Sequence, residues 1–145
     1  MAGPEEAPRE ESVVEELSEQ ECLDLLADHA VGRIVFVDHG QPMALPVNYV
    51  VDGRTVAFRT DPGTKFDAAT LGRVAFEVDD VASDAREAWS VLVKGIGRDI
   101  TEAIDEWSER VRSQRLEPWA AGERHHWIAL ADRSFSGRRI RRGPG

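Results

Sequence analysis

The segment FRTDPGTKFD, residues 58–67, concentrates side chains that bind phosphate. Arg59 and Lys65 supply positive charge, and Thr60 and Thr64 supply hydroxyl donors. A β-leaning run ends at this segment and a helix-like run follows it, so the free N–H groups of a helix N-terminus are expected beside these side chains. The alternative is a solvated turn that Thr64 caps, and the glycine spacing of a P-loop is missing. The residue types and spacing therefore leave a phosphate site and a capped turn both open.

A second candidate site lies in the strand-like run LPVNYVV. Pro46 cannot donate to a strand ladder, which favours a sheet edge or a bulge. Asn48 follows Val47 and precedes another apolar residue, where a polar side chain needs a partner. A strand of this kind can bind the polar edge of a planar heterocycle through its backbone and Asn48. A bulge in which Asn48 bonds its own backbone fits the pattern equally well.

Trp89 and Ser90 begin a third segment, WSVLVKG. An indole at the start of a strand can cover an aromatic ring, and the neighbouring hydroxyl can bind a phosphate or a carbonyl. The alternative is a tryptophan that belongs to the core. Near the C-terminus, Arg138 and Arg139 can either meet an anionic ligand or pair with the acidic N-terminal residues.

The histidines and the single cysteine show no metal-binding pattern. His125 and His126 are adjacent, and at least three ligands would have to come together from distant parts of the chain. Cys22 lies among apolar residues and is expected to be a small buried side chain. The chain has neither the GxSxG elbow of a serine hydrolase nor a dinucleotide-binding fingerprint. No metal site is predicted, and no catalytic residue is identified.

The net charge of −9 is concentrated at the N-terminus, where residues 1–20 carry seven Glu and one Arg. The rest of the chain is only mildly acidic, which argues against the basic face of a nucleic-acid-binding protein. The sequence contains no apolar run of the roughly 20 residues that span a bilayer. The acidic, proline-containing N-terminus is also unlike a signal peptide. We therefore expect a cytoplasmic protein with no nucleic-acid or membrane partner.

The chain is expected to fold as one domain over residues 17–142, after a disordered acidic tail over residues 1–16. Ser18 and Glu21 form a capping-box pattern, which predicts a helix near 19–29. Alternating and apolar patterns predict the remaining elements, in this order: strands at 31–38, 43–51 and 54–60, a short helix after Lys65, strands at 73–80 and 89–100, a helix over 101–116, and short strands at 125–130 and 135–140.

These elements predict a mainly β protein with helices. Strands separated by turns, including the Asp52-Gly53 hairpin signal, favour an antiparallel sheet or barrel over β-α alternation. Several strands are apolar on both faces, as in RIVFV, where Ile34 and Phe36 point one way and Val35 and Val37 the other. A small barrel with helices or a partner subunit packed outside would bury both faces.

The order of the motifs resembles a known family. The segments VGRIVFVDHGQPMALPVNYVVDGRTVAFRTDPGTKFDAA, VAFEVDD, WSVLVKGIGRDI and SGRRI are similar to the pyridoxamine 5'-phosphate oxidase-like family of flavin-binding split β-barrels. Within this family the sequence most resembles the nitroimidazole-resistance branch. The resemblance covers about residues 17–142, and its most specific parts are PVNY, FRT with GTK, and WSV with KG.

The resemblance implies a split antiparallel β-barrel that forms a homodimer, with FMN bound at the subunit interface. Arg59, Thr60 and Lys65 match the segment that holds the FMN phosphate, with Thr64 as a further ligand. The resemblance also places Arg33 near the pocket.

The PVNY strand matches the segment that runs along the isoalloxazine ring. Pro46, Val47 and Asn48 would contact the ring, largely through backbone groups. Trp89 and Ser90 match a strand start that reaches the flavin from the other subunit.

One departure from the family concerns its substrate site. The C-terminal ending of true pyridoxamine phosphate oxidases is replaced by SGRRIRR, which argues against that activity. The resemblance instead implies an FMN-dependent oxidoreductase acting on a small aromatic or heterocyclic substrate. A deazaflavin-dependent reductase and a non-catalytic flavin-binding or sensing module are the alternatives.

Overall fold

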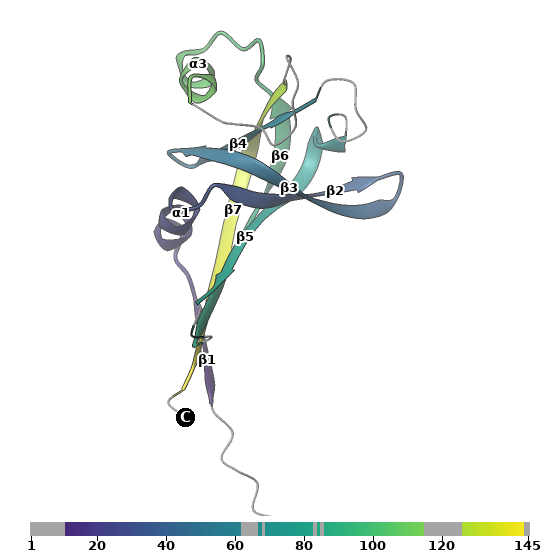
Figure 1. The fold of residues 1–145 in the computed structure, drawn as a ribbon. Coiled ribbons are helices and arrows are strands. Elements are labelled where there is room, and N and C mark those ends of the chain that lie inside the picture. The colour runs from purple at the N-terminus through teal and green to yellow at the C-terminus, as the bar shows by residue number, and fades with distance from the viewer. Residues whose placement is uncertain are drawn as a thin grey trace, which may run out of the picture.

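The computed structural model describes residues 11–61, 67, 69–82, 84, 86–114 and 126–143. Figure 1 shows long, strongly bent strands with one helix beside the sheet and another at its upper end. The elements are β1 (Ser12–Glu16), α1 (Glu19–Ala27), β2 (Val31–Asp38), β3 (Gln41–Asp52), β4 (Thr55–Thr60), β5 (Gly72–Val81), β6 (Glu87–Asp99), α3 (Glu106–Arg112) and β7 (His126–Arg142).

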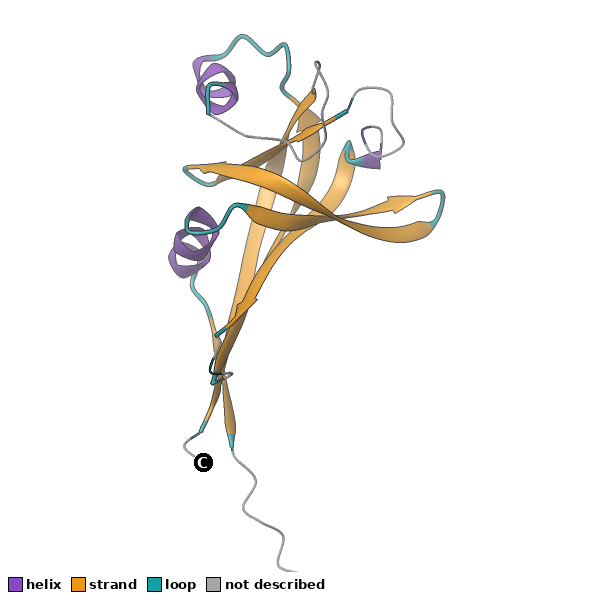
Figure 2. Cartoon of the chain, in the orientation of Figure 1, coloured by secondary structure: helices purple, strands orange, loops and turns teal. Residues whose placement is uncertain are grey.

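The sheet closes into a barrel. Its strand order is β1-β7-β4-β3-β2-β5-β6, and β6 pairs back to β7, so that β2 to β7 form a ring. Each of these pairings is antiparallel. β1 lies outside the ring and extends the far end of β7. The prediction of a mainly β protein with a split antiparallel barrel is confirmed, and Figure 2 shows the helices outside the strands.

The interior follows the alternation of the strands. Ile34 and Phe36 are fully or almost fully buried, whereas Val37 is 62% exposed. The buried side chains of the other strands join them in one core, which also takes in Cys22 and Leu26 of α1. A second, smaller cluster lies outside the barrel, where Val111 of α3 packs near Trp127. Both faces of the sheet are therefore apolar in part, as the sequence predicted.

The N-terminal helix is attached to the barrel through a buried hydrogen bond. Its predicted capping box is present, because Ser18 accepts from the Glu21 backbone and Glu21 accepts from the Ser18 backbone. The Tyr49 hydroxyl donates to the Leu26 carbonyl over 2.5 Å. Burial raises the pKa of Tyr49, which keeps this hydroxyl protonated as a donor. The bond thus joins the last turn of α1 to β3.

Replacing Tyr49 with phenylalanine should destabilise the fold by about 1–2 kcal/mol, because the Leu26 carbonyl would lose its buried donor. Denaturant unfolding monitored by tryptophan fluorescence measures this loss. Ser136→Ala, which removes an exposed hydroxyl from β7, is the surface control and should change the free energy of unfolding far less. Equal stability of Tyr49→Phe and the wild type would contradict the role of this bond.

Part of the predicted N-terminal tail is ordered. Residues 12–16 form β1, which pairs with the end of β7, whereas residues 1–10 lie outside the described residues. The many acidic residues around this short segment obscured its strand pattern in the sequence. Glu15 pairs with Arg141 at 3.5 Å, so opposite charges support the strand where little apolar surface is available. The boundary of the tail at residue 16 is therefore corrected.

The helix predicted over 101–116 begins later in the structure. Asp105 caps α3 by accepting from the backbone N–H of Ser108, and Ile104 is 90% exposed. Thr101 does not cap a helix, because its hydroxyl donates to Asp99 and accepts from the Trp127 backbone. Residues 115 and 116 lie outside the described residues.

The two short strands predicted at the C-terminus are one continuous strand of 17 residues, β7. The polar residues between them do not end the strand. Asp132 adopts a positive φ of 48°, and the pairing with β6 shifts between Lys94 and Ile96. A bulge of this kind bends a strand without ending it, which a hydrophobicity pattern does not reveal.

Candidate functional site

Arg59 is the strongest candidate ligand for an anion among the described residues. It lies near the end of β4, and its guanidinium stacks over the Trp127 ring at 4.6 Å from the ring centroid. The Nε atom is buried and has no hydrogen-bond partner. Burial lowers the pKa of Arg59, because a desolvated cation without a counter-ion is disfavoured. A bound anion would remove this penalty.

Thr60 is buried beside Arg59 and is already hydrogen-bonded. Its hydroxyl donates to the carboxylate of Asp67. The Asp67 carboxylate also lies 3.0 and 3.1 Å from Nδ1 of His126. The hydroxyl of Thr70 donates to the Asp67 carbonyl at 3.0 Å and fixes the short turn that carries Asp67. Thr60 would have to turn its proton away from Asp67 to donate to a phosphate.

The PVNY segment lies at an edge, as predicted from Pro46. β3 pairs with β2 only from Gln41 to Asn48, and its ladder with β4 begins at Tyr49. Pro46 and Asn48 therefore lie in the part of β3 that has a strand on one side only. Pro46 is exposed and Val47 is buried, so the backbone here is accessible from one face. Asn48 precedes Tyr49 and Arg59 follows Phe58, the partner of Tyr49, so Asn48 and Arg59 lie at the same end of the β3–β4 ladder.

Trp89 and Ser90 lie far from Arg59 within one chain. Trp89 pairs with Arg139 near the end of β7, whereas Arg59 pairs with Trp127 at its beginning. An extended strand as long as β7 spans about 55 Å. In Figure 1 the start of β6 lies beside β1, and the end of β4 lies at the opposite side of the barrel. A single chain does not gather these residues around one ligand.

The surroundings of Trp89 include both charge signs. Its ring meets the His29 ring edge-on at 4.8 Å. Trp89, Ser90 and Arg138 line a shallow hollow of about 170 Å³. Arg139 forms an ion pair with Glu87 of β6 at 2.7 Å. The sequence suggested either an anionic ligand or the acidic N-terminal residues as its partner, and the carboxylate found here belongs to neither.

The other predicted residues divide into two kinds. Thr64 and Lys65 lie outside the described residues. Arg33 is exposed, lies opposite Pro46 of β3, and pairs with Glu77 at 3.3 Å and Asp79 at 3.1 Å. The described residues contain no group of three histidine, cysteine or acidic side chains that could hold a metal ion. No helix among them is long and apolar enough to cross a membrane.

Residues 18–139 match the family described as Pyridoxamine 5'-phosphate oxidase. The chain belongs to this family.

Two solved structures of this fold resemble the chain along nearly its whole length. The FAD-binding protein from Mycobacterium smegmatis is 38% identical, with a TM-score of 0.72 over 89% of this chain and 98% of that chain. A putative pyridoxamine 5'-phosphate oxidase from Corynebacterium glutamicum is 28% identical, with a TM-score of 0.76 over 91% of this chain and 96% of that chain. A putative 5-nitroimidazole antibiotic resistance protein from Bacteroides thetaiotaomicron shares the fold at 10% identity, with a TM-score of 0.64 over 93% of this chain and 95% of that chain.

Three residues near Arg59 were not predicted as part of the site in this family member. The Trp127 ring lies under the Arg59 guanidinium, Asp67 accepts from the Thr60 hydroxyl, and His126 lies against the Asp67 carboxylate. Asp67 ends the opening segment FRTDPGTKFD, so its position in the sequence was a signal. Nothing in the sequence placed Trp127 and His126 beside this segment, because the pairing of β4 with β7 joins distant parts of the chain.

Proposed function

We propose that the protein binds a flavin nucleotide with Arg59 at the flavin phosphate, and that it is a flavin-dependent oxidoreductase acting on a small aromatic or heterocyclic substrate. The observation that carries the proposal is the buried, unpartnered Nε of Arg59. Charge-assisted hydrogen bonds from arginine suit a phosphate. Membership of the pyridoxamine 5'-phosphate oxidase family supports the same ligand class.

The sequence motifs favoured FMN as the flavin, and binding of FAD has to be measured alongside it. The Mycobacterium smegmatis structure that is 38% identical is described as an FAD-binding protein. FMN and FAD share the phosphate next to the ribityl chain, so Arg59 would serve either one. The remainder of FAD would need a further anion-binding group.

We propose that the cofactor lies between two copies of the chain, as the family resemblance implies. Arg59 and Thr60 lie at one end of β7, and Trp89 and Ser90 pair near its other end. A homodimer would bring Trp89 and Ser90 of one copy to Arg59 of the other. Pro46, Val47 and Asn48, on the edge part of β3, would run along the flavin ring.

The bound flavin would supply the redox chemistry. The protein would supply orientation, charge and exclusion of water. Arg59 would hold the phosphate, and the Trp127 ring would keep the guanidinium in place. The proposal assigns no proton transfer to a side chain.

The cofactor that co-purifies with the protein tests the proposal. Native mass spectrometry of protein purified without added ligand should show FMN or FAD bound, and the solution should show flavin absorbance. Titration of the protein with FMN, FAD and riboflavin then ranks the ligands by dissociation constant. A colourless protein that binds none of the three would contradict flavin binding.

A deazaflavin cofactor is the second candidate. Its longer and more acidic tail needs more positive charge, and Arg138 forms no ion pair within the described part of the chain. Tighter binding of the deazaflavin cofactor than of FMN and FAD would favour this alternative. Flavin binding without turnover of any donor would instead identify a non-catalytic flavin-binding or sensing module.

A further inference from the structure

The helix α3 is tied to the tip of the β3–β4 hairpin by a carboxylate that accepts three hydrogen bonds. Asp52 accepts from Nε and Nη2 of Arg110 at 3.0 and 3.1 Å, and from the Gln114 side-chain amide at 3.2 Å. The Asp52 side chain is only 17% exposed. Its hydrogen bonds to Arg110 raise the pKa of that guanidinium. A bidentate arginine–carboxylate pair has a fixed geometry, which sets it apart from most surface ion pairs.

α3 depends on contacts of this kind because it is short. It has seven residues, and an isolated helix of that length is not stable in water. Among the described elements, α3 packs extensively against no single strand. Val111 is its buried apolar side chain, and Arg112 donates to the Ile100 carbonyl. The bonds from Asp52 are therefore among the few contacts that hold α3 in place.

The apolar side of α3 belongs to the cluster that contains Trp127. Val111 and the partly buried Trp107 lie in this cluster, and Trp127 itself is 5% exposed. The Trp127 backbone N–H donates to the Thr101 hydroxyl at 2.9 Å, and the Trp127 carbonyl accepts from the Ile100 backbone at 2.9 Å. These bonds fix the main chain of Trp127 to the segment that leads into α3. The orientation of the Trp127 ring depends on packing within the cluster, to which α3 contributes.

The Trp127 ring in turn orients the Arg59 guanidinium. Arg59 and Trp127 lie directly opposite each other in the β4–β7 ladder, and the guanidinium lies 4.6 Å from the ring centroid. A guanidinium that stacks on an aromatic ring keeps its donors in the plane of the stack. The Nε of Arg59 has no hydrogen-bond partner among the described residues, which leaves the stacking on Trp127 to orient it.

We propose that Asp52 and Arg110 are positioning residues for the cofactor phosphate. Their ion pair holds α3 on the apolar cluster, the cluster holds the Trp127 ring, and the ring holds the Arg59 guanidinium. Asp52 pairs with Thr55 at the start of β4, whereas Arg59 lies near the end of β4, so Asp52 acts on Arg59 only through α3. The inference rests on the proposed function, because it requires that Arg59 binds the flavin phosphate.

A positioning role differs from a purely structural one in which ligand it affects. A misplaced Arg59 guanidinium weakens the contact with the phosphate and leaves the contacts with the flavin ring unchanged. Riboflavin has the ring and lacks the phosphate, so its affinity should not depend on the α3 attachment. A general loss of structure would weaken the binding of FMN and riboflavin in equal proportion.

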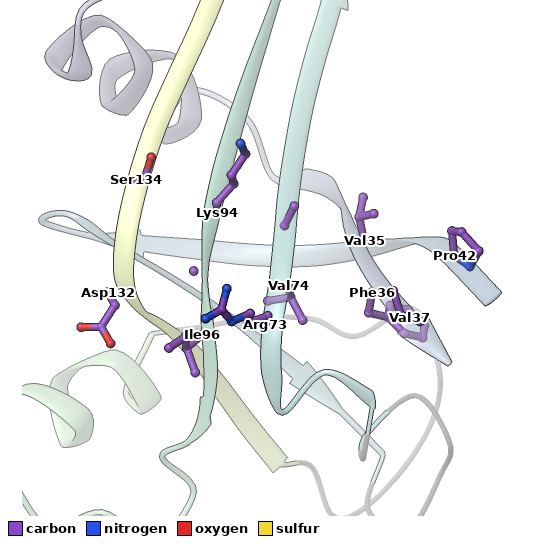
Figure 3. A pocket seen from close by; sticks show the side chains of 12 residues that line it. Val35, Phe36, Val37, Pro42, Arg73, Val74, Lys94, Ile96, Asp132 and Ser134 are labelled. Atoms are coloured by element: carbon purple, nitrogen blue, oxygen red, sulfur yellow. The ribbon is translucent and has the colours of Figure 1, made fainter. Parts of the chain in front are cut away.

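A hollow of about 490 Å³ between β2, β5 and β6 offers a second place for an anionic ligand, because Arg73 and Lys94 line it (Figure 3). Its described lining residues include no residue of α3 and neither Arg59 nor Trp127. A phosphate held in this hollow would not respond to changes at Asp52 and Arg110. A response of the FMN affinity to these two residues would therefore assign the phosphate to the Arg59 side of the barrel.

Charge reversal with a compensating partner tests the attachment. Arg110→Asp alone and Asp52→Arg alone should each raise the FMN dissociation constant about 5-fold and leave that of riboflavin within about twofold. The double variant Asp52→Arg with Arg110→Asp restores an ion pair and should return the FMN dissociation constant to within about twofold of the wild type. Gln114 is compatible with either arrangement, because its amide both donates and accepts. Glu109→Lys, which reverses an exposed charge on the same helix, is the control and should leave both dissociation constants within about twofold.

A second comparison asks whether the effect passes through Arg59. In the Arg59→Ala background, Arg110→Asp should change the FMN dissociation constant less than twofold, because the contact that it positions is gone. Circular dichroism of each variant establishes that the barrel is folded. Arg110→Gln, which removes the charge without adding repulsion, should shift the FMN dissociation constant in the same direction by a smaller factor.

The outcomes separate this inference from the proposed function. An unchanged FMN dissociation constant in both single reversals, an equal loss for riboflavin, or an effect that persists without Arg59 would each overturn the positioning role while flavin binding stands. If Arg59→Ala itself leaves the FMN affinity unchanged, the phosphate contact of the proposed function fails, and the positioning role fails with it.

Discussion

Replacing Arg59 with alanine should weaken FMN binding by roughly 10- to 150-fold. A charge-assisted hydrogen bond contributes about 1.5–3 kcal/mol, and every 1.4 kcal/mol is tenfold in affinity. Arg59 is the candidate because its Nε is buried without a partner and the Trp127 ring holds its guanidinium. Quenching of flavin fluorescence on titration measures the dissociation constant directly.

Two controls separate the phosphate contact from a general loss of structure. Riboflavin lacks the phosphate, so its affinity should be nearly the same for Arg59→Ala and the wild type. Arg54→Ala removes an exposed cation at the other end of β4 and should leave the FMN dissociation constant within about twofold, since a distant, exposed ion pair contributes little. A loss of FMN and riboflavin affinity in equal proportion would place Arg59 in the scaffold instead of at the phosphate.

Lys65→Ala tests the same phosphate site, to which Lys65 is assigned from the sequence alone. It should weaken FMN binding by about 1.5–3 kcal/mol if Lys65 also contacts the phosphate. Because Lys65 lies outside the described residues, this expectation rests on its place in FRTDPGTKFD and on the family resemblance. An unchanged dissociation constant would remove Lys65 from the site.

The local elements of the barrel could be predicted because their signals are local. The span of β2, the hairpin turn at Gly53 and the capping box of α1 each depend on a few neighbouring residues. The continuity of β7 could not be predicted in this way. The polar middle of β7 stays in the sheet because it pairs with β6, and a bulge between Lys94 and Ile96 accommodates the shift in register.

The sequence predicted which types of residue the site contains, but not how these residues are arranged in space. Arg59 was found from the sequence, and its unpartnered Nε supports that choice. The engagement of Thr60 with Asp67 was not foreseen, because it depends on how the turn after β4 folds back. The distance between Arg59 and Trp89 also depends on strand pairing around a closed barrel, which no short motif encodes.

Replacing Gly97 with alanine should destabilise the fold by about 3 kcal/mol, the upper part of the usual range for an overpacked site. A Cβ at Gly97 would lie 1.8 Å from the backbone oxygen of Thr70. Thr70 ends the turn that carries Asp67, and its hydroxyl donates to the Asp67 carbonyl. The clash is with backbone, so a side-chain rotation cannot relieve it.

The turn around Thr70 would have to move, and the movement would reach the candidate site. Because Asp67 accepts from Thr60 and lies against His126, we expect Gly97→Ala to weaken FMN binding as well as lower the melting temperature. Gly95→Ala is the matched control on the same strand. Its Cβ would lie 2.8 Å from the carbonyl oxygen of Ala131, and the bulge between Lys94 and Ile96 leaves the backbone room to adjust. Thermal unfolding should therefore rank wild type above Gly95→Ala and Gly95→Ala above Gly97→Ala, and the reverse order of the two variants would show that the turn, unlike the bulge, yields without cost.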